Sequence, residues 1–104
     1  MKRFFLTGYY SKERTTGVSE IERIINQTGF IVDFKMFSDI SLSLTIEIEE
    51  RKVDRLCDDL QTIMSLNSFN KLNLNSESEC VVFLNITFTK GTGDLKIEVP
   101  SIPG

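Results

Sequence analysis

Hydrophobic and polar residues alternate along two segments of the chain, 41–49 and 80–89. This period of two predicts strands with one buried face. The aromatic-rich segment 2–10 predicts a first strand, and the segment from Phe30 to Phe37 predicts another. We expect the core to contain the apolar positions of the alternating strands: Leu42, Leu44, Ile46, Ile48, Val82, Leu84 and Ile86.

Two other segments repeat apolar residues every three or four positions, which predicts amphipathic helices. The first helix begins near Val18, or alternatively at Thr16, and ends before Gly29. Ser19 and Glu22 fit a capping box at its start. The second helix follows the strand 41–49. The apolar faces are Val18, Ile21, Ile24 and Ile25 in the first helix and Val53, Leu56, Cys57, Leu60, Ile63 and Met64 in the second.

The predicted order is strand, helix, strand, strand, helix, strand. Strands with one polar face need helices on the other face only, so the order predicts a two-layer α+β sandwich. Right-handed crossovers place the first and third strands in the middle of the sheet, as in the ferredoxin-like βαββαβ arrangement. A polar loop is expected at 67–79. A turn at 90–94 and a short strand at 95–99 predict an added C-terminal hairpin strand, and residues 1–104 are expected to form a single domain.

The first two-thirds of the chain resembles the ACT domain, a regulatory module of ferredoxin-like fold, over residues 4–64. The resemblance is carried by Phe5-Leu6-Thr7-Gly8, by Gly17-Val18 at a helix start, by Gly29-Phe30-Ile31-Val32-Asp33 and by Leu42-Ser43-Leu44-Thr45-Ile46-Glu47-Ile48. It implies a non-enzymatic domain that binds a small metabolite such as an amino acid. Arg14-Thr15-Thr16-Gly17 stands where the family loop often carries an aspartate before Pro-Gly.

The candidate ligand site lies in the loop after the first strand, where a helix amino terminus offers backbone N–H groups to an anion. A ligand carboxylate is expected near Thr16 and Gly17, and its ammonium group near Asp33. The alternative is a solvated loop whose threonines cap the helix. The candidate ligand-binding residues are Gly8, Arg14, Thr15, Thr16, Gly17, Val18 and Asp33.

Composition excludes several classes of chemistry. The chain has no histidine, which removes Ser-His-Asp and Cys-His nucleophiles and histidine metal sites. Twelve basic and 15 acidic residues give a net charge of −3, which argues against nucleic acid and anionic membranes as partners. We expect no enzyme activity, cofactor or metal, and a cytoplasmic location. Cys57 and Cys80 are expected as buried, unpaired thiols, with a disulfide as the alternative.

Three further patterns have simpler explanations. Lys90-Gly91-Thr92-Gly93-Asp94 lacks the spacing of a phosphate loop and predicts a hairpin turn. Acidic residues between 47 and 59 predict a solvated face rather than a cation site. An acylphosphatase-like site would rest on Arg14 alone, and an RNA-recognition motif would need aromatic residues on the third strand, where Ser43, Thr45 and Glu47 stand.

Two functions remain from different classes. The first is the ACT-like regulatory or ligand-binding domain. The alternative is a protein-interaction or structural module of the same fold without a small ligand.

In both cases the strand 30–37 is expected at an edge of the sheet. It has no proline and few charges, so we expect a homodimer through this strand unless the loop 67–79 covers it. Strict alternation divides its side chains between two faces. Phe30, Val32, Phe34 and Met36 share one face, and Ile31, Asp33, Lys35 and Phe37 share the other, which carries the charges and is expected to be solvated.

Overall fold

The computed structural model describes residues 1–67 and 70–89. These residues form an α+β fold with two α-helices and a five-stranded mixed sheet. In chain order the elements are β1 (Arg3–Tyr10), α1 (Arg14–Ile25), β2 (Gly29–Ser38), β3 (Ser41–Glu49), a 3-10 turn (Glu50–Lys52), α2 (Val53–Leu60), β4 (Ser65–Leu66) and β5 (Glu79–Phe88). The predicted C-terminal turn 90–94 and strand 95–99 lie outside the described residues.

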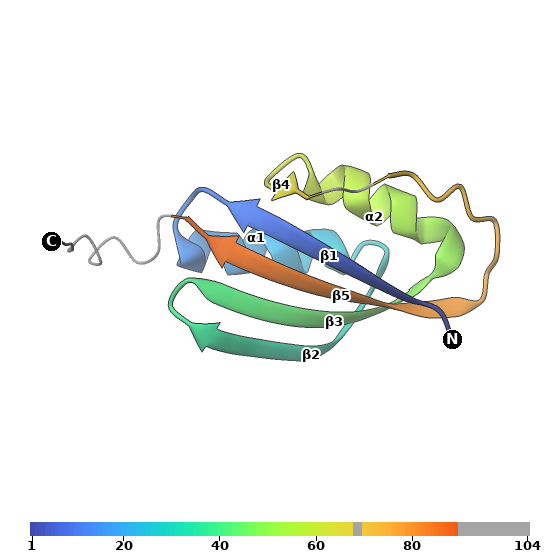
Figure 1. Ribbon diagram of the computed structural model, residues 1–104, viewed down its shortest axis with the longest axis horizontal. Coiled ribbons are helices and arrows are strands. Elements are labelled where there is room, and N and C mark those ends of the chain that lie inside the picture. The colour runs from blue at the N-terminus through green and yellow to red at the C-terminus, as the bar shows by residue number, and fades with distance from the viewer. Residues whose placement is uncertain (68–69, 90–104) are drawn as a thin grey trace, which may run out of the picture.

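The strand order in the sheet is β2-β3-β5-β1-β4 (Figure 1). The first and third strands are interior as predicted, but they are not neighbours, because β5 lies between them. β5 pairs parallel with β1 over all of β1, from Arg3↔Val81 to Tyr10↔Phe88, and antiparallel with β3. The short strand β4 pairs antiparallel with the other side of β1. The predicted polar loop therefore begins after a strand that the sequence pattern did not indicate.

Both helices lie against the same face of the sheet, and Figure 1 shows α1 behind the strands. Apolar side chains from alternating strand positions pack on the helices. Every core residue predicted from the alternation is confirmed, since none of these side chains is more than 2% exposed. Burial of this apolar layer is the main favourable contribution to folding. We call the opposite face of the sheet the open face.

The predicted boundaries of the first helix are wrong at both ends. The helix α1 begins at Arg14, with Glu13 as its N-cap and no side-chain cap. Ser19 lies inside the helix and therefore cannot be part of a capping box. Gly29 is the first residue of β2, where a Cβ would stand 2.7 Å from the carbonyl oxygen of Glu47. A glycine is required here because β3 approaches closely. It is not required to end the helix.

The faces predicted for β2 are wrong at its start. Ile31, expected on the solvated face, pairs with Ile46 and packs against the core. Phe30 pairs with Glu47 instead and is exposed. The pairing of β2 with β3 shifts by one residue just after Ile31. Such a shift moves the side chains on one side of it to the other face, so strict alternation assigns Phe30 and Ile31 to the wrong faces.

Beyond this shift the predicted faces of β2 hold for three charged or aromatic residues. Asp33 and Lys35 pair with polar residues of β3 and lie on the open face. Phe34 lies opposite Leu44 on the helix side. A second shift follows between Met36 and Ser38, so the strand is regular only in its middle.

In the described part of the chain, no helix is long and apolar enough to cross a membrane.

Candidate interaction surface

The start of α1 carries several of the predicted ligand residues. Thr15 and Thr16 are exposed in the first turn, and Gly17 is buried. The Gly17 N–H donates a hydrogen bond to the Glu13 carbonyl at 2.9 Å. Because the helix starts at Arg14, this N–H is already inside the helical hydrogen-bond ladder. It cannot receive the carboxylate of a ligand as expected.

The two glycines among the candidate ligand residues, Gly8 and Gly17, are packing positions. A Cβ on Gly17 would stand 2.6 Å from Tyr10 Cε2 and 2.9 Å from Phe88 Cε1. A Cβ on Gly8 would stand 2.6 Å from Met64 Sδ. Both glycines therefore allow close approach of neighbouring elements on the helix side of the sheet. Their presence does not indicate a ligand.

Arg14 joins the helix start to the turn between β2 and β3. Its Nη1 lies 3.3 Å from Asp39 Oδ1, and both side chains are partly exposed. An ion pair of this kind contributes about 0–1 kcal/mol, because solvent screens it. Arg14 thus already has a carboxylate partner within the chain.

Asp33 lies apart from the other candidates. It is exposed on the open face, where it pairs across the strands with Thr45. Gly8, Gly17 and the half-buried Val18 all lie on the helix side. The predicted site residues are consequently divided between the two faces of the sheet.

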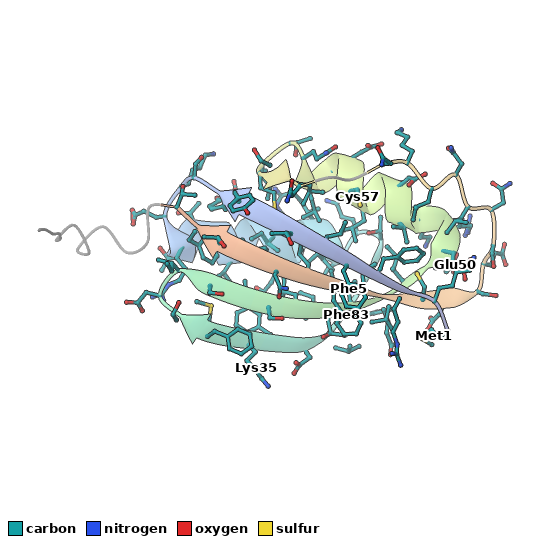
Figure 2. The ribbon with its side chains drawn as sticks, in the orientation of Figure 1. Met1, Phe5, Lys35, Glu50, Cys57 and Phe83 are labelled. Atoms are coloured by element: carbon teal, nitrogen blue, oxygen red, sulfur yellow. The ribbon has the colours of Figure 1, made fainter. Side chains whose placement is uncertain are left out.

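The edge strand β2 carries an unusual number of exposed apolar side chains. It pairs with β3 on one side, and no described strand pairs with its other side. Phe30, Val32, Phe34 and Phe37 are 69%, 50%, 42% and 66% exposed. A long edge with unpaired backbone groups and apolar side chains is a template for strand pairing. Figure 2 shows Lys35 on this edge, pointing away from the sheet.

The loop 70–78 does not cover β2. Both carboxylate oxygens of Asp54 in α2 accept backbone N–H groups of the loop, from Leu72 and Asn73, at 2.8 Å each. Lys71 reaches Asp58 of the same helix at 3.3 Å. These contacts hold the described part of the loop against α2, so the alternative that it shields the edge is wrong.

Phe5 and Phe83 form an aromatic pair on the open face that sequence reasoning missed. Their ring centroids are 5.1 Å apart at an interplanar angle of 16° (Figure 2). The two residues face each other across β1 and β5. The predicted sheet had β3 beside β1, and the exposed positions of that strand, Ser43, Thr45 and Glu47, offer Phe5 no aromatic partner. Only the observed strand order brings Phe83 next to Phe5.

The thiols of the described chain are buried. Cys57 and Cys80 are free, which confirms the prediction of unpaired cysteines. Burial, together with the charges of Asp54 and Asp58, raises the pKa of Cys57 to about 12. Burial also raises the pKa of Cys80. Thiols of this kind are protonated at neutral pH and are poor nucleophiles.

The acidic residues predicted as one solvated face have separate surroundings. Glu50 is buried and lies 3.6 Å from the Lys2 ammonium, Glu49 pairs with Arg51, and Asp54 holds the loop. In the described ranges, no group of three or more His, Cys, Asp or Glu side chains could hold a metal ion.

No family model, no curated protein and no solved structure matches the chain. We therefore base the function on one feature of the described residues, the exposed edge of β2.

Proposed function

We propose that the chain is a non-enzymatic protein-interaction module whose binding element is the edge of β2. The partner adds a β-strand to this edge. The single observation behind the proposal is the ten-residue edge strand with four exposed large apolar side chains. In strand addition, main-chain hydrogen bonds supply affinity and alternate side chains supply specificity. Exposed apolar groups gathered along one edge of the molecule mark such an interaction site.

The scaffold that we propose is a ferredoxin-like βαββαβ sandwich with one inserted strand. β1, α1, β2, β3, α2 and β4 supply the six elements, and the antiparallel pairing of β4 with β1 fits the final strand of that arrangement. β5 is then the addition, placed between β1 and β3. In this proposal the resemblance to ACT domains concerns the scaffold.

The division of the predicted ligand residues favours an interaction module over an amino-acid site. An amino acid needs its carboxylate and ammonium groups bound at one place, whereas Gly17 and Asp33 lie on opposite faces of the sheet. A thermal-shift screen with the common amino acids separates the two functions. A true ligand at 100 times its Kd adds about 2.7 kcal/mol of stability, and the interaction module shows no shift.

A labelled peptide tests the edge directly. The peptide has the sequence of Ser41–Glu49, which already pairs antiparallel with the inner side of β2 and alternates apolar with polar residues. We expect saturable binding by fluorescence anisotropy. Binding is expected to fall in a variant with both Val32→Lys and Phe37→Lys, because lysines on an edge strand oppose pairing.

Phe5→Lys is the matched control for the peptide experiment. It makes the same type of change at a side chain that is 76% exposed, on the open face and away from the edge. The control variant is expected to bind the peptide as well as the unchanged chain does. Absence of peptide binding to an unchanged chain that is monomeric contradicts the proposed function.

A further inference from the structure

The regular part of β2 carries one acidic and one basic residue on the same face. Between its two register shifts the strand runs from Asp33 to Met36. Asp33 and Lys35 pair across β3 with Thr45 and Ser43, and both lie on the open face. Two opposite charges two positions apart are thus exposed on a free edge.

We infer that the strand added to this edge is β2 of a second copy, paired antiparallel about a two-fold axis through Phe34. This inference rests on the proposed function and names its partner. In this arrangement Asp33 faces Lys35 of the partner subunit, and Lys35 faces Asp33 of the partner subunit. A two-fold interface repeats every contact, so one complementary pair produces two.

Strand geometry limits the choice of axis. Directly paired residues of an antiparallel ladder point to the same face. The two-fold axis therefore lies midway between two copies of the same residue, and we name each possible axis by that residue. An axis through Asp33 opposes two carboxylates, and an axis through Lys35 opposes two ammonium groups. Like charges directly opposite each other destabilise a pair of strands. The axis through Phe34 is the one that opposes unlike charges.

The same axis gives nearly the longest overlap of the two strands. Counted along the sequence, Phe30 then lies level with Ser38 of the partner subunit, and the regular stretch from Asp33 to Met36 lies near the centre of the overlap. An axis through Met36 instead carries the pairing into the turn at Asp39 and leaves Asp33 opposite a second carboxylate. Strand length therefore disfavours the axis at Met36, and the charge pattern selects Phe34 over Asp33 and Lys35.

Exposed apolar side chains of β2 support this pairing. Phe34 lies opposite Leu44 on that side, and the axis brings it against Phe34 of the partner subunit. Val32 and Phe37 flank the centre and are exposed in the single chain. Covering these groups removes apolar surface from water and favours association. The two sheets become one, with both pairs of helices on the same side.

Charge reversal tests the register, and both target residues are exposed, so folding is preserved. Asp33→Lys places lysine opposite lysine, and Lys35→Asp places aspartate opposite aspartate. By sedimentation velocity at tens of micromolar, we expect the unchanged chain to be a dimer. Each variant alone is expected to dimerise about 10-fold or more weakly, because two attractive pairs become two repulsive pairs.

Mixing the two variants gives the sharper result. The Asp33→Lys copy presents two positive groups at the edge, and the Lys35→Asp copy presents two negative groups. A 1:1 heterodimer is therefore expected at the affinity of the unchanged chain. The variant with both reversals is expected to dimerise alone. Glu47→Lys is the control, because it reverses a charge on the same face but one strand inward, and it is expected to leave the dimer intact.

The outcomes separate the inference from the proposed function. A monomeric unchanged chain, or a dimer that both single reversals leave intact, overturns the inference. If the Ser41–Glu49 peptide nevertheless binds the edge, the proposed function stands with a different partner. If the peptide also fails to bind, both are overturned.

Discussion

Gly17 lies so close to the ring of Tyr10 that a Cβ on Gly17 would stand 2.6 Å from Tyr10 Cε2. Tyr10 is fully buried, and its ring also meets Phe88 edge to face, with centroids 5.8 Å apart. Its hydroxyl donates a 2.6 Å hydrogen bond to Glu20, about one turn further along α1. Together these contacts of Tyr10 hold the first turns of α1 against the ends of β1 and β5.

Substitution of Gly17 by valine tests this contact. Tyr10 and Phe88 are both held in the core, so overpacking is expected to cost about 1–3 kcal/mol in the free energy of unfolding. Urea denaturation measures the loss. Thr16→Val adds a valine at the exposed neighbouring position and serves as the control, with a change within about 0.5 kcal/mol. Equal stability of the two variants contradicts the packing role of Gly17.

Tyr10 gives the protein a defined loss of stability at high pH. Burial, then the hydrogen bond to Glu20 and its charge, raise the pKa of Tyr10 to about 12, against about 10 in an unfolded chain. The folded state holds the hydroxyl proton of Tyr10 more tightly than the unfolded state does. The contribution of Tyr10 to the free energy of unfolding is therefore complete below about pH 10 and is lost as the pH rises from about 10 to 12. Urea denaturation at about pH 9 and about pH 11 measures the free energy of unfolding on either side of that lower limit. This free energy is expected to fall less between the two pH values in Tyr10→Phe than in the unchanged chain. An equal drop in both proteins shows that Tyr10 does not cause it.

Leu44 tests the core on the middle of β3. Its side chain is 1% exposed, and truncation to alanine is expected to cost about 2–5 kcal/mol through lost burial and the cavity that remains. Thermal or urea unfolding measures this cost. Ser43→Ala, the adjacent position on the open face, is the control and is expected to change stability by less than about 0.5 kcal/mol. A similar cost at both positions is incompatible with the observed faces of β3.

Local patterns predicted the elements well and their arrangement only in part. The alternation in 41–49 and 80–89 identified β3 and β5 because each strand has one buried and one solvated face. Strand order depends on which edges meet, and no residue pattern within β5 indicates that it enters between β1 and β3. The strand β4 has two residues, too few for any period to be visible.

The candidate site was predicted with less success for physical reasons. A glycine that permits close packing and a glycine that admits a ligand have the same sequence signature, and only the atoms around Gly17 distinguish them. The register shift between Ile31 and Asp33 breaks the period of two, so strict alternation placed Phe30 and Ile31 on the wrong faces. The prediction of β2 as an edge strand is confirmed within the described sheet. That prediction came from the element order, which puts the second strand of a split βαβ arrangement at an edge.

The position of β5 has a consequence for the order in which the chain folds. Arg3 pairs with Val81, far along the chain, so the first strand to be synthesised waits for the last described strand before its ladder can form. The β2–β3 hairpin needs only adjacent residues and can form early. Pairings of such long range slow folding, because the entropy of closing the chain is lost before the contacts are gained. Until β5 arrives, both β1 and the inner edge of β3 remain open to pairing with other chains, and this interval is when the protein is most prone to aggregate.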